Sequence, residues 1–159
     1  MAACELCATP GGELIWQDEF CRVVRLDDVD YPGFCRVILN RHTKEMSDLE
    51  AHERERLMEV VFAVEQAVRD VMQPDKINLA SLGNVTPHLH WHVIPRYRSD
   101  RHFPNPIWGQ STHETAPNQL DNPTATRLKA RIQQLLANWC VLQGNDALKW
   151  GRRIIYRLI

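Results

Sequence analysis

The stretch His88-Leu89-His90-Trp91-His92-Val93-Ile94 places three histidines at alternate positions with apolar residues between and after them. Side chains on a β-strand alternate between its two faces. This spacing therefore predicts a strand with three imidazoles on one face and Leu89, Trp91 and Val93 on the other. The apolar face is expected to pack against helices and the histidine face to look outward. Neighbouring imidazoles would start two residue rises apart, about 6.5–7 Å, a spacing that one phosphate group can bridge.

Three interpretations fit this predicted strand. The first is a structural strand that carries histidines by chance, although only seven of the 159 residues are histidine. The second is chelation of one metal ion by three imidazoles. The third is nucleophilic catalysis, in which a neutral imidazole attacks phosphorus while a neighbouring imidazole supplies a proton or holds the anion. Phosphoryl chemistry depends mostly on positioning and charge stabilisation, which histidines, loop amides and arginines provide, so the third interpretation is favoured.

The rest of the chain predicts an α+β domain. Five short segments, rich in β-branched and aromatic residues and bounded by turn signals, predict strands over 13–17, 21–26, 34–40, 76–82 and 88–97. A helix is expected from about Asp48 to Met72, because Ser47-Asp48-Leu49-Glu50 has the form of a capping box. A second helix is expected to begin with Asn122 as its cap and to end at Gly144. This order predicts a five-stranded antiparallel sheet packed with helices.

Composition limits the class of protein. The chain carries a formal net charge of −1 and 44% hydrophobic residues, which suits one compact domain with a sizeable core. No apolar run reaches the roughly 18 residues that a membrane span needs, and the N-terminus lacks the features of a secretory signal. We therefore expect a cytoplasmic protein without a membrane partner. The near-neutral charge also argues against nucleic acid as a partner, despite a net charge of +6 from Thr124 to Ile159.

The pair of cysteines in Cys4-Glu5-Leu6-Cys7 is the second motif. It is open to three interpretations: two thiols in a mobile terminus, a redox dithiol, or half of a zinc site. No strand precedes the pair to build a thioredoxin-like unit, which argues against the redox interpretation. Zinc in a structural site takes four ligands in a tetrahedron, so the zinc interpretation requires two further ligands from elsewhere in the chain.

Taken together, these motifs resemble the histidine triad (HIT) superfamily of nucleotidyl hydrolases and transferases. The defining pattern, His-φ-His-φ-His-φ-φ with φ an apolar residue, is matched by residues 88–94 without departure. The surroundings agree with it in Lys76-Ile77-Asn78 of the preceding strand, in the Gly83-Asn84 loop and in the Tyr31-Pro32-Gly33 turn. The resemblance covers about residues 4–110 and implies a HIT-like fold.

Two parts of the chain are expected on this basis. Residues 1–110 would form the HIT domain, and residues 111–159 a C-terminal loop and helical extension. The polar, proline-bearing segment 99–121 predicts a long loop. Its Phe103 and Trp108 are open to three roles: covering a nucleotide base, reaching a partner subunit, or pinning the loop to the core.

The resemblance also implies how the site works. The middle histidine, His90, would attack the α-phosphorus of a nucleotide and form a nucleotidyl-histidine that water then cleaves. His92 would contact the phosphate, and Asn84 or Asn78 would help to hold it. The chain would thus be a nucleotide hydrolase that cleaves a phosphoanhydride or a phosphoramidate.

Several further expectations follow from the family. An acidic or amide residue before the Pro-Gly turn holds the ribose hydroxyls, here Asp27 or, alternatively, Asp28. Dinucleoside polyphosphates or nucleoside phosphoramidates are the expected substrates, and the protein is expected to be a homodimer. The related uridylyltransferases have glutamine where this chain has His92, which favours hydrolysis. Two alternatives stay open: nucleotidyl transfer to an acceptor other than water, and a nucleotide-binding module without catalysis.

The resemblance also completes the zinc interpretation. HIT branches similar to galactose-1-phosphate uridylyltransferase pair an N-terminal C-x-x-C with a histidine after the third strand and with the first histidine of the triad. This chain has His42 and His88 at those positions. The resemblance therefore implies a structural zinc bound by Cys4, Cys7, His42 and His88. Such a site would fix the N-terminus and orient the catalytic strand, leaving the other two histidines free.

Overall fold

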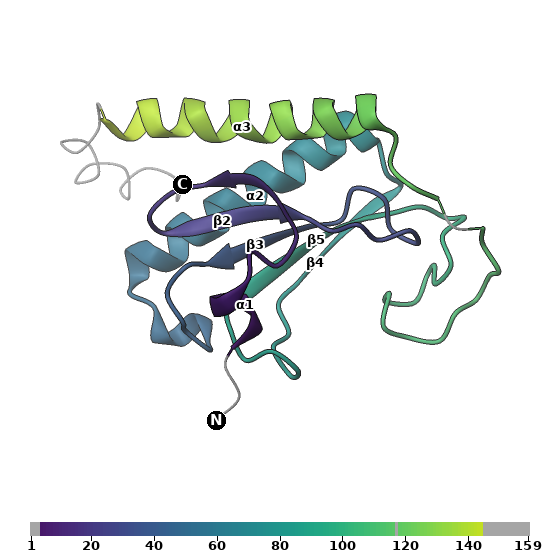
Figure 1. Ribbon diagram of the computed structural model, residues 1–159, viewed down its shortest axis with the longest axis horizontal. Helices are drawn as coiled ribbons and strands as arrows, with labels where there is room; N and C mark the ends of the chain where they lie inside the picture. Colours follow the sequence, from purple (N-terminus) through teal and green to yellow (C-terminus); the bar gives the residue numbers. More distant parts are fainter. Residues whose placement is uncertain (1–3, 117, 145–159) are drawn as a thin grey trace, which may run out of the picture.

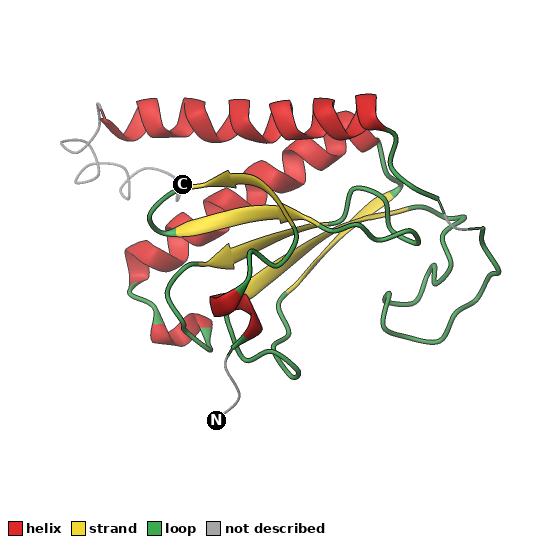
Figure 2. Cartoon of the chain, viewed as in Figure 1, coloured by secondary structure: helices red, strands yellow, loops and turns green. Residues whose placement is uncertain are grey.

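One antiparallel sheet forms the centre of the molecule. The computed structural model describes residues 4–116 and 118–144. Its strands lie in the order β1-β2-β3-β5-β4, with every neighbouring pair antiparallel. Their bounds are β1 Glu13–Gln17, β2 Cys21–Arg25, β3 Cys35–Leu39, β4 Lys76–Ala80 and β5 His90–Arg96. This sheet and the helices around it confirm the predicted α+β class (Figures 1 and 2).

The two long helices cover one face of the sheet. They are α2, Ala51–Met72, and α3, Asn122–Gly144, and two shorter elements are the helix α1, Glu5–Ala8, and the 3-10 helix η1, Met46–Asp48. Figure 1 shows α2 behind the strands and α3 along the edge formed by β1. The main core lies between the sheet and these helices and includes the fully buried Val23, Val37, Val93, Leu57, Val61, Val64, Leu128 and Ile132. The opposite face of the sheet is thereby left for the polar residues of β3, β4 and β5.

The long helix begins three residues later than predicted. Glu50 is its N-cap, and the carboxylate of Glu53 accepts the backbone N–H of Glu50 at 3.0 Å, so these two residues form the capping box. The box predicted between Ser47 and Glu50 is wrong. Ser47 lies instead within η1, which has its own reciprocal box between Glu45 and Asp48. The stretch thus contains two capping boxes with the same spacing, Glu45 with Asp48 and Glu50 with Glu53. Each of them caps a separate helix.

The cap of α3 also differs from the prediction. Asn122 is already helical, and the carboxylate of Asp121 accepts the backbone N–H of Thr124 at 2.8 Å. A carboxylate at a helix N-terminus satisfies an otherwise unpaired donor and interacts favourably with the helix dipole. The helix is further tied to α2 by an ion pair between Arg131 and Asp70.

β5 is shorter than the predicted strand 88–97. It begins at His90, because Leu89 donates its backbone N–H to the carbonyl of Thr43 at 2.7 Å and His88 bonds through its ring. The predicted apolar face is confirmed, since Leu89, Trp91 and Val93 all pack into the main core. The strand therefore presents His90 and His92 to the opposite face.

The segment between β5 and α3 is a long loop, as predicted, and a buried ion pair fixes its start. Arg96 and Asp100 are 2% and 8% exposed, and two hydrogen bonds of 2.7 and 3.0 Å join the guanidinium to the carboxylate. Asp100 also accepts the backbone N–H groups of Tyr97, His102 and Phe103. Although burial alone would raise it, these bonds hold the pKa of Asp100 below its usual range. The loop is thus tied to the end of the sheet.

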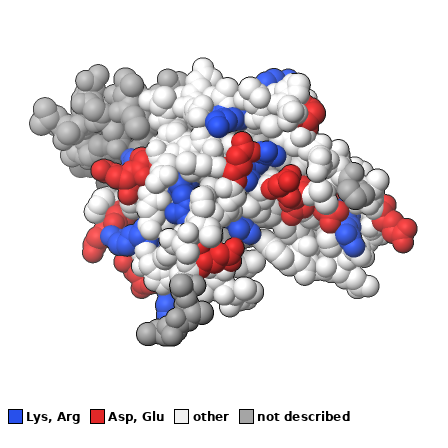
Figure 3. Space-filling model, in the orientation of Figure 1, with Lys and Arg blue, Asp and Glu red and all other residues white. Residues whose placement is uncertain are grey.

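The surface gives two further observations. Within the described parts of the chain, no helix combines the length and the apolar character required to cross a membrane. Figure 3 shows acidic and basic side chains interspersed over the visible face, where no single basic patch gathers.

We expect Asp100→Asn to lower the free energy of unfolding by about 3–5 kcal/mol, because it leaves the buried guanidinium of Arg96 without a counter-charge. Asp75→Asn is the matched control, since Asp75 pairs with the exposed Arg98, and it should cost less than about 1 kcal/mol. Urea denaturation of both variants measures the difference. Equal stability of the two variants would show that the buried pair does not anchor the loop.

Candidate functional site

Two histidines of β5 form a close pair on the sheet face that α2 and α3 leave free. The ring centroids of His90 and His92 are 4.7 Å apart with an interplanar angle of 70°. Both rings are buried, at 7% and 4% exposure, so the expectation of an outward-looking histidine face is wrong in this respect. Phe34 and Trp108 pack beside His92, with ring centroids 5.5 and 5.1 Å from it, and help to exclude water.

A backbone hydrogen bond fixes the tautomer of His90. Its Nδ1 lies 2.6 Å from the carbonyl oxygen of His88, and a carbonyl can only accept, so Nδ1 carries the hydrogen. The lone pair is therefore on Nε2. Burial, with a smaller effect from the charge of Arg36, lowers the pKa of His90 and keeps the ring neutral near pH 7. A neutral imidazole with a free Nε2 is the nucleophilic form.

His92 is also neutral under ordinary conditions. Burial lowers its pKa to about 3, with further contributions from His90 and Arg36. Its Nδ1 is a buried atom with no hydrogen-bond partner among the described residues. Buried polar atoms are rarely left unsatisfied, and those at a site often await a ligand.

His88 directs both of its ring nitrogens to partners outside the histidine pair. Its Nε2 donates to the carbonyl of Leu39 at 2.7 Å, so its Nδ1 carries a lone pair. That lone pair faces the Sγ atoms of Cys4 and Cys7, each 3.4 Å away. His88 precedes the first residue of β5, so these long-range contacts set the direction of its ring.

All four predicted metal ligands come together around this ring. The Nδ1 of His42 lies 3.4 Å from the Sγ of Cys7, and one ligand atom from each of Cys4, Cys7, His42 and His88 lies within 4.8 Å of the others. Usual zinc–sulfur and zinc–nitrogen bond lengths in a tetrahedron give sulfur–nitrogen separations of about 3.6 Å. The donor set, its spacing and the neutral form of His88 all fit a tetrahedral metal ion.

Arg22 of β2 supports the N-terminal segment that carries the cysteines. Its guanidinium donates to the carbonyls of Leu6, Thr9 and Pro10 at 2.5, 3.3 and 3.0 Å. A further bond of 3.2 Å runs to the side chain of Asn40, close to His42 in the chain. The sequence analysis missed this residue, because nothing local to β2 shows which carbonyls lie above it.

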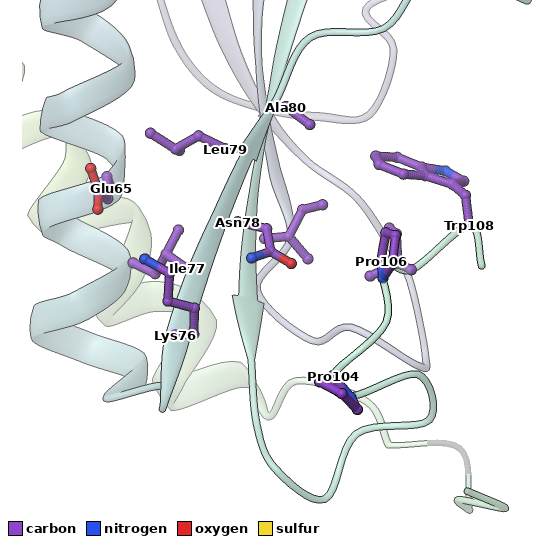
Figure 4. A pocket seen from close by; sticks show the side chains of 11 residues that line it. Glu65, Lys76, Ile77, Asn78, Leu79, Ala80, Pro104, Pro106 and Trp108 are labelled. Carbon is purple, nitrogen blue, oxygen red and sulfur yellow. The ribbon is translucent and has the colours of Figure 1, made fainter. Parts of the chain in front are cut away.

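A cavity of about 590 Å³ lies beside the histidine pair, between β4 and the loop 103–108. Figure 4 shows Asn78 of β4 across the cavity from Pro106 and Trp108. The Oδ1 of Asn78 accepts a 2.5 Å hydrogen bond from Arg96, which leaves the amide NH₂ available to a ligand. Trp108 contacts both this cavity and the ring of His92.

The other residues predicted to contact the substrate, Asn84 and Asp27, are exposed. Asn84 lies in an exposed loop before β5, and Asp27 is exposed after β2. The alternative, Asp28, is partly buried, and its Oδ1 accepts the backbone N–H groups of Asp30 and Tyr31. No contact joins Asn84 or Asp27 to the histidine pair within the described chain.

The loop residues Phe103 and Trp108 do different things. Phe103 packs against the guanidinium of the buried Arg96, 5.9 Å from its ring, and so helps to pin the loop. Ile107 also holds the loop to the core, because it packs on the cluster of Tyr31, Phe34 and Ile94. Trp108 is 53% exposed and lies against His92, so pinning to the core does not account for it.

Arg36 of β3 is the second residue that the sequence analysis missed. It pairs in register with His92 and therefore lies on the histidine face. The available signal was its position in the predicted strand 34–40, where it is charged between the apolar Cys35 and Val37. Only the strand order, with β3 beside β5, shows that this charge lies next to the histidine pair.

Solved structures resemble this fold over most of its length. A histidine triad protein from Marinobacter aquaeolei VT8 is 27% identical, with a TM-score of 0.65 over 84% of this chain and 94% of that one. A histidine triad protein from Bradyrhizobium japonicum is 26% identical, with a TM-score of 0.63 over 77% and 90%. A zinc-bound histidine triad family protein from Mycobacterium smegmatis is 20% identical, with a TM-score of 0.60 over 86% and 97%, and shares the fold.

The search of curated proteins gave no match. A family model described as the HIT domain matches residues 11–99, which include the whole sheet and the histidine pair. This match spans more than half of the chain, and the chain therefore belongs to the HIT domain family.

Proposed function

We propose that the protein is a nucleotide hydrolase that cleaves a phosphoanhydride or phosphoramidate bond at the α-phosphorus through a nucleotidyl-histidine on His90. Membership of the HIT family supports nucleotide hydrolase or transferase chemistry. The observation that carries the assignment is the hydrogen bond from Nδ1 of His90 to the carbonyl of His88, which leaves Nε2 as the nucleophilic atom. His92 is the neighbouring group that contacts the phosphate.

The reaction proceeds in two displacements. In the first, the Nε2 lone pair of His90 forms a bond to phosphorus, and the bond to the leaving group breaks with its electron pair going to that group. An amine leaving group also takes up a proton from solvent as it departs. The imidazolium formed keeps its Nδ1–H on the His88 carbonyl, whose partial negative charge stabilises it. In the second, water attacks phosphorus, the nitrogen–phosphorus bond returns its electrons to Nε2, and the proton of water passes to solvent.

Three further residues are proposed to hold the substrate. Asn78 offers its free amide NH₂ beside the cavity, so it is the better supported of the two asparagines. Asn84 lies on the loop that leads into His88 and would have to reach the phosphate from there. Asp27 would bind the ribose hydroxyls, for which its exposed carboxylate is available.

We also propose that Cys4, Cys7, His42 and His88 hold a structural zinc ion. Two thiolates and two neutral imidazoles are a usual donor set for closed, tetrahedral zinc sites. When bound, the ion supplies a fixed link between the N-terminal segment and the residues before β5. A redox role for the two cysteines is less consistent with two imidazole nitrogens among the ligand atoms.

A homodimer and a cytoplasmic location complete the proposal. Among the described strands β4 pairs with β5 alone, so its outer edge is the place proposed for a second copy. The cavity beside β4 is bounded by this edge, which would bring the second copy close to the site. Cytoplasmic location rests on the expectation of reduced cysteines and stays a prediction.

Replacing His90 tests the nucleophile. We expect His90→Ala to reduce kcat on diadenosine polyphosphates and adenosine phosphoramidate by at least about a thousand-fold, because no other side chain supplies the bond to phosphorus. Wild-type protein quenched during turnover should carry a nucleotidyl group on the peptide that contains His90, measured by mass spectrometry. His52→Ala, at an exposed position on α2, is the control and should retain activity.

The same assay separates the alternatives. Turnover that persists in His90→Ala contradicts the nucleophile assignment. Nucleotide binding by the wild-type protein without turnover or adduct would favour a binding module. Adduct formation with product appearing only on an added alcohol or phosphate acceptor would indicate a transferase.

Metal analysis tests the zinc site. Protein purified without added metal should contain about one zinc per chain, and Cys7→Ser should lose most of it together with part of its thermal stability. His113→Ala is the control, because His113 is an exposed histidine outside the cluster, and its zinc content should match the wild type. A wild-type stoichiometry near zero, or full zinc retention in Cys7→Ser, would rule out the site.

A further inference from the structure

Arg36 lies at the edge of the histidine pair, and none of the described residues forms an ion pair with it. On one side it pairs in register with His92 of β5, and on the other with Val24 of β2. Its side chain is partly buried, its guanidinium carbon lies 5.9 Å from the ring centroid of Phe34, and Phe34 also packs on His92. Arg36 and His92 therefore share one apolar wall.

One polar atom of Arg36, its Nε, is buried and unsatisfied among the described residues. These residues also provide no ion pair for its guanidinium. Other arginines on the sheet are fully engaged: Arg22 bonds to three carbonyls, Arg25 pairs with Glu13, and Arg96 pairs with Asp100. A guanidinium that is partly removed from water and unpaired costs free energy unless a ligand supplies the missing acceptor.

The charge of Arg36 acts on the site itself. Arg36 pairs in register with His92 and contributes to the lowered pKa of that ring, so the guanidinium lies within electrostatic range of it. Glu5 and Asp28 act on Arg36 from a distance, but neither forms an ion pair with it. The unsatisfied Nδ1 of His92 belongs to the residue that pairs in register with Arg36. One anion between the two would satisfy both.

We infer that Arg36 binds a second phosphate of the substrate, adjacent to the α-phosphate that His90 attacks. The inference rests on the proposed function and deepens it, because it selects the substrate class: a nucleoside polyphosphate, with a phosphate as the leaving group, in preference to a phosphoramidate that releases an amine. Arginine suits this task because its planar fork of N–H donors matches phosphate oxygens.

The chemistry of the leaving group explains the preference. When the phosphorus–oxygen bond of an anhydride breaks, its electron pair goes to the bridging oxygen, and negative charge grows on the departing phosphate. A fixed guanidinium beside that phosphate stabilises the transition state more than the ground state. When a phosphorus–nitrogen bond breaks, the amine leaves only after it gains a proton, and a nearby guanidinium gives it no charge stabilisation.

Two matched substrates test the inference. Diadenosine tetraphosphate and adenosine 5′-phosphoramidate present the same nucleoside and α-phosphorus but differ in the leaving group. We expect Arg36→Gln to reduce the ratio of their kcat/KM values by about thirty-fold or more, with Arg36→Lys in between because it keeps a point charge without the fork. Assays at pH 8, above the pKa of both imidazoles, exclude an effect through their protonation.

Arg98→Gln is the matched control. Arg98 is an exposed arginine paired with Asp75, away from the histidine face, so its replacement should leave the ratio unchanged. Equal losses on both substrates in Arg36→Gln, or no loss, overturn the inference. Should Arg36→Gln fail to fold, the fall in the ratio for Arg36→Lys decides in the same way.

A binding measurement separates this inference from the proposed function. We expect the wild-type protein to bind ADP about tenfold more tightly than AMP in calorimetry, and Arg36→Gln to abolish that difference. This result supports the second-phosphate site even if the protein hydrolyses neither substrate, in which case the proposed function alone fails. Equal affinity of the wild type for ADP and AMP overturns the inference, as does an equal loss for both ligands, which would place Arg36 against the nucleoside.

Discussion

The site depends on how one residue, His88, uses its hydrogen-bonding groups. The ring Nε2–H bonds to the carbonyl of Leu39 at the end of β3, which turns Nδ1 towards the two cysteines. The carbonyl of the same residue accepts the Nδ1–H of His90. A single residue therefore fixes the tautomer of its own ring, as a metal ligand requires, and the tautomer of His90, as a nucleophile requires. A shift of His88 would disturb both.

Two supports hold the histidine face from opposite ends of the sheet. At one end, Arg22 binds the carbonyls of the N-terminal segment, so the cysteines stay over β2 and β3. At the other end, the buried pair of Arg96 and Asp100 ties down the loop that brings Trp108 against His92. Both supports use arginine, because its several donors can satisfy many loop carbonyls and carboxylate oxygens at once. The rings of His90 and His92, which lie between the two supports, are buried, and this burial favours their neutral form.

The sequence predicted best those features that depend only on neighbouring residues in the chain. Alternation of apolar and histidine residues predicted the core face of β5 correctly, because that signal needs only the strand. For His88 the strand has not yet begun, and a long-range bond to Leu39 sets the direction of the ring. The proposed metal ligands Cys4 and His88, 84 residues apart, were predicted from the family resemblance, since spacing alone left the role of the cysteines open. Arg36 was missed because only the placement of β3 beside β5 gives it a role.

A nucleophile for phosphorus and a binding site for phosphate make opposite electrostatic demands. Positive charge attracts the substrate, yet protonation of the attacking imidazole would remove its lone pair. In this site the two demands fall on different residues. Burial and the charge of Arg36 both disfavour protonation of His90, so the ring stays nucleophilic, while the guanidinium on the neighbouring strand carries the positive charge that an anion requires. Under the proposed function, this arrangement lets one arginine attract the substrate and preserve the reactivity of the group that attacks it.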